Sequence, residues 1–183
     1  MIAIGNHSLR LMQLGDAEKL LDLIDRNRDR LLKYFPITVS SVTNLRTSNT
    51  YISQKIHQAN NKEFFAYFIE EKDTGNLIGM YMLKSFNWRI PKCELAYFID
   101  ESREGMGIIS KITKSMVDHC FSELKMNKIW IETGEDNIAS KTIALKNGFK
   151  LEGLLRDNFR DFNGNLLNIE YYGLIRADWV GKL

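Results

Sequence analysis

The sequence has few of the residues that bind metals or act as thiol nucleophiles. It contains two cysteines, Cys93 and Cys120, and three histidines scattered singly along the chain. The cysteines are far apart and have neither CxxC nor Cys/His spacing, so a metal site is not expected. Each cysteine lies in an apolar or strand-like run, where a small buried hydrophobic residue is the ordinary interpretation. We therefore assign no chemistry to either cysteine.

The chain also lacks linkers, long apolar runs and an excess of one charge. Only two prolines occur and no segment is rich in Pro, Gly and Ser, so residues 1–183 are expected to form a single domain. No apolar run reaches the roughly 18 residues of a membrane span, and the first residues do not resemble a signal peptide. The net charge of +2 comes from interspersed basic and acidic residues, unlike a nucleic-acid-binding face. We expect a compact cytoplasmic protein that binds neither nucleic acid nor a membrane.

Hydrophobic periodicity predicts two helices between strands in the first half of the chain. A strand is expected at residues 8–13. Asp16 is placed to cap a helix that ends before Pro36, and a second helix is expected at residues 42–57. Residues 63–71 and 77–83 flank an Asp-Thr-Gly-Asn turn and predict a β-hairpin.

The second half predicts strands that alternate with helices. A strand at 93–100 leads through a loop at 101–107 into an amphipathic helix that begins at Ile108. Another strand is expected at 128–133, a short helix at 137–146, and strands at 149–155 and 167–175. The turn sequence Asn-Gly-Asn before the final strand predicts that the last two strands are antiparallel. The whole pattern indicates a mixed α/β sheet with helices on its faces.

Two glycines, Gly105 and Gly107, lie where a predicted strand gives way to a predicted helix. Backbone N–H groups converge at a helix start, the helix dipole favours an anion, and glycine lets the backbone approach a phosphate. The spacing is not GxGxxG, and no Lys-Ser/Thr pair follows as in a Walker loop, so ATP and NAD are disfavoured. On spacing alone, an ordinary strand-to-helix turn is as good an interpretation as a phosphate site.

Two longer runs resemble a known family. Residues 94–111, ELAYFIDESREGMGIISK, resemble the loop of the GNAT superfamily in which Gln/Arg-x-x-Gly-x-Gly/Ala cradles the pyrophosphate of coenzyme A. Asn137-x-x-Ser140, followed by Lys-Asn-Gly-Phe at 146–149 and Glu-Gly-Leu-Leu-Arg at 152–156, closely resembles the RimJ/RimL branch of that superfamily. The resemblance covers nearly the whole chain and is strongest over residues 94–156.

The resemblance implies the GNAT fold, a mixed and mostly antiparallel α/β sheet with splayed central strands and helices on both faces. It implies transfer of an acetyl group from acetyl-CoA, without a metal, to a primary amine by direct attack in a ternary complex. The first acceptor to expect is the N-terminal α-amino group of a ribosomal protein or another peptide. A small amine such as a polyamine or antibiotic, and a non-catalytic acyl-CoA-binding module, are the alternatives. Monomer and homodimer both stay open.

The family's motifs also imply roles for residues at matching positions. Glu94 matches a glutamate that accepts the amine proton directly or through water, although a solvated strand carboxylate is an equal interpretation. Ser140 matches a serine that hydrogen-bonds the departing thiolate, although a helix serine can bond its own backbone instead. A backbone N–H near Phe98 or Ile99 is expected to face the oxyanion. The expected coenzyme-binding residues are Phe98, Ile99, Arg103, Glu104, Gly105, Met106, Gly107, Ile108, Ile109, Asn137 and Ser140.

Four positions depart from the family pattern. Glu104 stands at the usual Gln/Arg position and brings a carboxylate near the expected pyrophosphate, and Ile109 replaces a small residue. Ala144 stands where many members have a tyrosine that protonates the thiolate, and Phe159 stands where some members of the branch have a second carboxylate. Backbone donors in the loop do not depend on these side chains, so coenzyme binding is still expected. The strand glutamate is then the better candidate for the base.

Overall fold

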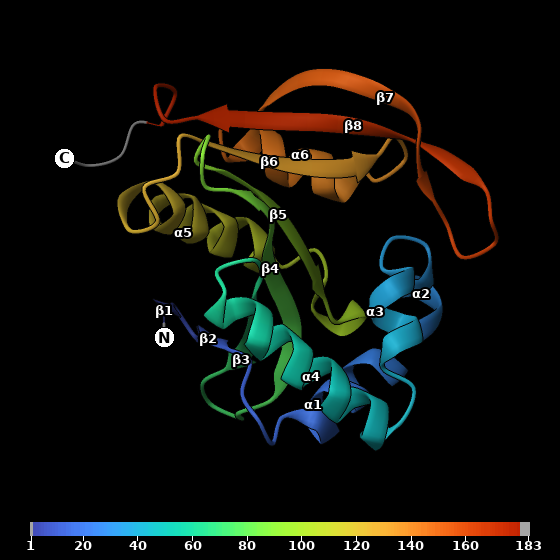
Figure 1. Ribbon diagram of the computed structural model, residues 1–183. Coiled ribbons are helices and arrows are strands. Elements are labelled where there is room, and N and C mark those ends of the chain that lie inside the picture. The colour runs from blue at the N-terminus through green and yellow to red at the C-terminus, as the bar shows by residue number, and fades with distance from the viewer. Residues whose placement is uncertain (1, 180–183) are drawn as a thin grey trace.

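The described chain forms an eight-stranded sheet with helices on both faces (Figure 1). The computed structural model describes residues 2–179. The strands are β1 (Ile2–Ile4), β2 (His7–Leu11), β3 (Phe65–Glu71), β4 (Leu77–Asn87), β5 (Lys92–Ile99), β6 (Lys128–Gly134), β7 (Lys150–Arg160) and β8 (Leu166–Ile175). The helices are α1 (Ala17–Asp25), α2 (Arg28–Leu32), α3 (Pro36–Ser41), α4 (Leu45–Asn60), α5 (Ile108–Ser122) and α6 (Ile138–Lys146), with a 3-10 helix η1 (Glu101–Arg103).

The strand order is β1-β2-β3-β4-β5-β6-β8-β7, and every neighbouring pair is antiparallel except β5 and β6. Because side chains alternate along a strand, the sheet sends apolar residues into two separate cores. Phe68 and Phe98 pack on the face covered by α1 to α4, whereas Leu95 and Ile129 pack on the face covered by α5. This is the mixed, mostly antiparallel arrangement that the resemblance implies.

The two central strands separate partway along their length, as expected. β5 pairs with β6 only from Lys92 to Glu94, opposite Lys128 to Trp130. Beyond that point β5 stays bonded to β4 and β6 stays bonded to β8, so each strand keeps its outer neighbour. The backbone groups that β5 and β6 turn toward each other in this gap are available to a ligand.

The loop after β5 also has the predicted form. Gly107 occupies the N-cap position of α5 with a left-handed backbone (φ 72°), and Gly105 has the same φ. Such a φ is unfavourable for residues with a side chain, which explains why glycine stands at both positions. The loop therefore turns sharply from the end of the sheet into the helix.

The prediction of one helix from Asp16 to just before Pro36 is wrong. The chain breaks at Asn27 into α1 and α2, where the Asn27 side chain bonds the carbonyl of Leu23. Asp16 stands at the N-cap of α1 as expected, but its carboxylate makes no cap bond, because both of its oxygens bind Arg10. Pro36 follows α2 and begins a further helix, α3, since the first turn of a helix needs no backbone N–H.

The other predicted elements are confirmed with shifted bounds. The helix expected at 42–57 is α4, which starts after Asn44 because Asn44 and Thr47 form a reciprocal capping box. Both predicted hairpins, β3–β4 and β7–β8, are antiparallel pairs, and β7 extends to Arg160. β1 was not predicted, because three residues are too short to show a period. None of the helices within residues 2–179 has the length and apolar character needed to span a membrane.

Candidate active site

A cleft of about 840 Å³ brings together the residues singled out by the two sequence motifs. It runs between the separated ends of β5 and β6, the loop before α5, the start of α6 and helix α2. Among the lining residues are Glu94, Phe98, Ile99, Arg103, Glu104, Gly105, Gly107, Ile108, Ile109, Asn137 and Ser140. Met106 is the exception, since its side chain is 60% exposed and does not line the cleft.

The loop offers backbone donors at one end of the cleft. The first hydrogen bond of α5 runs from the N–H of Lys111 to the carbonyl of Gly107, so the preceding amides of the helix are not paired within it. Within residues 2–179, the N–H groups of residues 105–107 also have no acceptor. A Cβ added at Gly105 or Gly107 would meet no atom within 4 Å, so this space is open to a ligand. Converging donors and open space fit an anion such as a pyrophosphate.

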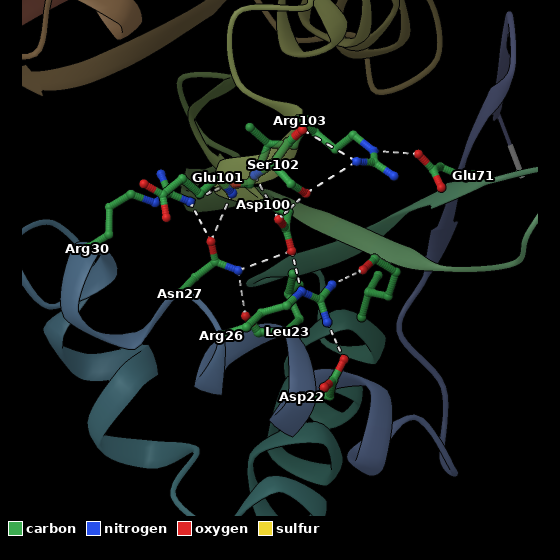
Figure 2. A network of polar contacts seen from close by, with 12 residues as sticks. Asp22, Leu23, Arg26, Asn27, Arg30, Glu71, Asp100, Glu101, Ser102 and Arg103 are labelled. Carbon is green, nitrogen blue, oxygen red and sulfur yellow. Dashed lines mark hydrogen bonds and ion pairs between the residues drawn. The ribbon is translucent and has the colours of Figure 1, made fainter.

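A buried polar network fixes this loop to the first two helices (Figure 2). Asn27 is 3% exposed and uses its whole hydrogen-bonding capacity. Its Nδ2 donates to Leu23 O at 2.9 Å and to Asp100 Oδ2 at 3.3 Å, and its Oδ1 accepts from Glu101 N and from Arg30 Nη2, both at 3.0 Å. The break between α1 and α2 therefore places one amide beneath the loop.

Asp100 links the same loop to α1 through hydrogen bonds of its carboxylate. Its Oδ1 accepts from the N–H and the hydroxyl of Ser102, and its Oδ2 accepts from Arg26 (Figure 2). Burial raises the pKa of Asp100, but Arg26 and Ser102 outweigh burial and hold that pKa well below its ordinary value. The carboxylate is therefore charged at every pH where the protein would be assayed.

We expect Asn27→Ala to destabilise the protein by about 2–3 kcal/mol, since it leaves buried donors and acceptors without partners. Urea unfolding measures the change. Asn44→Ala, which removes an exposed helix cap, is the matched control and should cost about 1 kcal/mol. Equal losses in the two variants would show that the buried network adds nothing beyond an ordinary cap.

The unusual Glu104 is neutralised by a residue from α2. Arg30 binds Glu104 through Nη1, and through Nη2 it binds the carbonyl of Ile99. Arg103, which could have offset this carboxylate, binds Glu71 on β3 at 2.7 Å instead. The cation that the family pattern puts in the loop is thus supplied from a different part of the chain, which the sequence did not reveal.

Glu94 lies at the base of the gap and is 6% exposed. Its carboxylate binds Lys84 Nζ at 2.8 Å and accepts from Ser85 Oγ at 3.0 Å. Burial raises the pKa of Glu94, while Lys84 lowers it and nearby Glu132 raises it. The interpretation as a solvated surface carboxylate is wrong, because this group is buried and faces a cleft.

Glu132 is a second carboxylate of the cleft that the sequence did not single out. It lies on β6, two residues beyond Trp130, the partner of Glu94 in the paired part of the strands. The indole N–H of Trp130 donates to Glu132 Oε1 at 3.1 Å. Only the pairing of β5 with β6 shows that Glu94 and Glu132 share one face, so no local pattern could have identified Glu132.

Ser140 faces the cleft from the first turn of α6. Its hydroxyl lies 3.1 Å from the hydroxyl of Tyr97, and either oxygen can be the donor. Asn137 caps the helix, since its Oδ1 accepts from the N–H of Ser140 at 3.1 Å. Burial raises the pKa of Tyr97 to about 12 against a smaller lowering by Ser140. Because the Ser140 hydroxyl bonds Tyr97, it is not used in a local helix bond.

The backbone of β5 distinguishes Ile99 from Phe98. Phe98 O lies 2.6 Å from the position of a Cβ on Gly79, so the polar groups of Phe98 point toward β4. The bond from Asp100 N to Ile78 O has the same direction. Since strand backbone groups alternate in direction, the N–H and carbonyl of Ile99 point into the gap. The bond from Arg30 to Ile99 O agrees with this orientation.

The structure also shows where two other positions that depart from the family pattern lie, Phe159 and Ala144. Phe159 lines the cleft, so an apolar ring stands where some relatives carry a carboxylate. Ala144 is buried in the core on the α5 face and offers no polar group. Tyr34, from the segment after α2, donates to Asp136 and packs against Gly134 at the cleft.

Comparison with known proteins gives the family. The model of the acetyltransferase (GNAT) domain matches residues 8–150. YdaF of Bacillus subtilis (strain 168), provisionally named a ribosomal N-acetyltransferase, is 29% identical over 177 residues, covering 96% of this chain and 94% of YdaF. The ribosomal-protein-serine acetyltransferase of Escherichia coli (strain K12) is 32% identical over 101 residues, covering 55% of this chain and 54% of that protein.

Solved structures show the same fold. RimL, described as a ribosomal L7/L12 alpha-N-protein acetyltransferase in complex with coenzyme A, superimposes with a TM-score of 0.86 at 21% identity. The match covers 93% of this chain and 94% of the RimL chain, and at this identity it carries the fold alone. With the family model spanning most of the sequence, this chain belongs to the GNAT acetyltransferase family, whose enzymes take their acetyl group from acetyl-CoA.

Proposed function

We propose that this protein acetylates the N-terminal α-amino group of a protein or peptide, with both substrates bound in the cleft at once. The observation that carries the proposal is the cleft itself, which joins an anion-binding loop to a buried carboxylate through the gap between β5 and β6. The names of YdaF and of the Escherichia coli relative support a ribosomal protein as the acceptor.

The residues of the loop fit the pyrophosphate of coenzyme A. The free N–H groups of residues 105–107 and the start of α5 supply donors, and the glycines leave room for the phosphates. The carbonyl of Ile99 accepts from Arg30, which leaves its N–H in the gap for an oxygen of the coenzyme or of the acetyl group. Acetyl-CoA bound there would supply the acetyl thioester, and the residues of this chain would orient the two substrates and place charged groups beside them.

Glu94 serves as the base for the acceptor. An N-terminal amine is largely protonated at neutral pH and attacks only as the free base, so its proton must be removed. Glu94 accepts that proton directly or through water, and burial, by raising its pKa, makes it a better base. Glu132, beside it on β6, adds the negative charge that a cationic amine would meet in the cleft.

The N–H of Ile99 stabilises the acetyl oxygen, which gains negative charge as the amine nitrogen bonds the carbonyl carbon. Phe98 is not suited to this role, because its polar groups are directed at β4. The two positions expected from the family motif are thus reduced to one by the pairing of β4 with β5.

Ser140 and Tyr97 stabilise the sulfur as the carbon–sulfur bond breaks and the electron pair leaves with it. Full proton transfer from Tyr97 is unfavourable, because its pKa of about 12 lies above that of a thiol. Tyr97 therefore donates to Ser140 and Ser140 donates to the sulfur as hydrogen bonds, without a net transfer from the tyrosine.

We expect Ser140→Ala to lower kcat by about 10- to 100-fold while changing the Kd for acetyl-CoA little, since the bond strengthens only as charge develops on sulfur. Steady-state kinetics and calorimetry on the same preparation measure the two effects. Ser110→Ala on α5, a helix serine that also lines the cleft, tests whether any lost hydroxyl has this effect. A wild-type kcat in Ser140→Ala, with chemistry limiting, would remove Ser140 from the reaction.

The acceptor is tested with a panel. Acetyl-CoA is incubated with peptides that copy ribosomal-protein N-termini, with the same peptides blocked at the α-amino group, and with polyamines, and thiol release is followed. Turnover with free but not blocked peptides supports the proposal. Preference for polyamines would favour the small-amine alternative, and no turnover with any amine would favour an acyl-CoA-binding module.

A further inference from the structure

Thr133 carries a buried hydroxyl that the fold does not use. Its side chain is 4% exposed, and its Oγ1 has no hydrogen-bond partner within residues 2–179. Thr133 lies on β6, three residues beyond Trp130, where the pairing with β5 ends, and it lines the cleft. A buried polar atom without a partner is disfavoured unless something outside the chain binds it.

Thr113 shows how the same fold treats another buried threonine. It is fully buried on α5, and its Oγ1 accepts a hydrogen bond from the hydroxyl of Tyr81 at 3.3 Å. Thr133 differs from Thr113 in that its hydroxyl has no partner within residues 2–179, although the residue lines the cleft.

The side chain of Thr133 lies on the same face of the sheet as Tyr97 and lines the same cleft as Ser140. Side chains alternate along β6, and Ile129 and Ile131 point into the core on the α5 face. Thr133 therefore points to that same face, where Ser140 lines the cleft from α6. Glu132 points to the opposite face with Trp130, toward the proposed acceptor.

We propose that Thr133 donates a hydrogen bond from Oγ1 to the sulfur of coenzyme A, in the thioester and more strongly in the departing thiolate. The inference rests on the proposed function, because it needs the acetyl end of the coenzyme in this cleft. No covalent bond to Thr133 forms or breaks, since the electron pair of the carbon–sulfur bond stays on sulfur. A second donor is useful there because negative charge develops on sulfur as the carbon–sulfur bond breaks, and each hydrogen bond to that charge stabilises it.

The test compares Thr133→Val, which keeps the shape and removes the hydroxyl, with Thr133→Ser, which keeps the hydroxyl. In the complex with coenzyme A, the pKa of the coenzyme thiol is measured from the ultraviolet absorbance of the thiolate. We expect Thr133→Val to raise this pKa by about 1–2 units and to lower kcat by about 10- to 100-fold, as for one hydrogen bond to a charge. Thr133→Ser should keep the wild-type thiol pKa.

Two further measurements separate this role from a structural one. Without ligand, Thr133→Val should keep or raise Tm, because no bond within the protein is lost, whereas Thr113→Val should lower Tm by leaving Tyr81 without an acceptor. Affinity for desulfo-coenzyme A, which has no sulfur, should be the same in Thr133→Val and in the wild type.

An unchanged thiol pKa in Thr133→Val would overturn the inference. A fall in Tm equal to that of Thr113→Val would also overturn it, because the hydroxyl would then have a partner in the protein. Weaker binding of desulfo-coenzyme A would assign the hydroxyl to another part of the coenzyme. The thiol pKa needs no acceptor, so failure of every amine to react would count against the proposed function and leave this measurement valid.

Discussion

Gly107→Val is expected to abolish measurable binding of acetyl-CoA while α5 stays folded. The open space at Gly107 is where the phosphates would lie, and valine would fill it with two methyl groups. Valine at a φ of 72° also strains the backbone by about 1–3 kcal/mol, which would tilt the neighbouring N–H groups away from a common centre. Calorimetric titration with acetyl-CoA measures the loss, and circular dichroism confirms the fold.

Gly75→Val separates strain from the lost binding space. Gly75 has nearly the same φ, 68°, and its Cβ would also meet nothing within 4 Å, but it lies in the β3–β4 turn and does not line the cleft. This variant should lose some stability and keep its affinity for acetyl-CoA. If Gly107→Val bound acetyl-CoA as tightly as the wild type, the coenzyme would lie elsewhere and the proposed function would lose its main support.

Glu94→Gln is expected to lower kcat/KM by about 100-fold near pH 7, the scale typical of a lost general base. Below the amine pKa of about 8, the acceptor arrives protonated and depends on the base, so the deficit should be large there and shrink toward pH 9. In the wild type the rate should fall with acid as Glu94 becomes protonated. Because burial raises the pKa of Glu94, that fall should begin above the range of an ordinary glutamate.

Lys84 provides the check on this assignment. Lys84 lowers the pKa of Glu94, so Lys84→Met should move the acid limb of the pH–rate profile to higher pH. Glu94→Gln should show no acid limb from this group at all. If the acid limb stays in place in both variants, the base is a different group, and a wild-type rate in Glu94→Gln at pH 7 would make water the acceptor of the proton.

The glycine loop and the start of α6 were accessible to prediction because their signals are local. The glycines at 105 and 107 stand between a strand and a helix, and a left-handed backbone at a helix N-cap accounts for both without reference to the rest of the chain. Asn137 and Ser140 are likewise one turn apart, so a helix cap follows from their spacing. The alternation within residues 93–100 placed Glu94 on a strand, but could not tell which face is covered.

Contacts between distant segments were not accessible. Arg30 meets Glu104 across 74 positions, and this pairing turns an unfavourable carboxylate in the loop into a neutral pair. Tyr97 meets Ser140 across 43 positions, so the hydroxyl of Ser140 is hydrogen-bonded to the hydroxyl of a residue far away in the sequence. Neither contact follows a helical or strand period, because each depends on which elements the sheet brings together.

By itself the sequence determined the strands from β2 onward, the helices α4 to α6, the glycine loop and the resemblance to the family, because periods of two and 3.6 residues, turn residues and motifs are properties of short segments. The tertiary structure decided where α1 ends, since the amide of Asn27 is needed beneath the loop and not in a longer helix. It also decided that the polar backbone groups of Ile99 rather than Phe98 face the gap, and that the hydroxyl of Thr133 has no partner within residues 2–179. These outcomes depend on strand register and on the separation of β5 from β6, which arise only when the whole sheet is assembled.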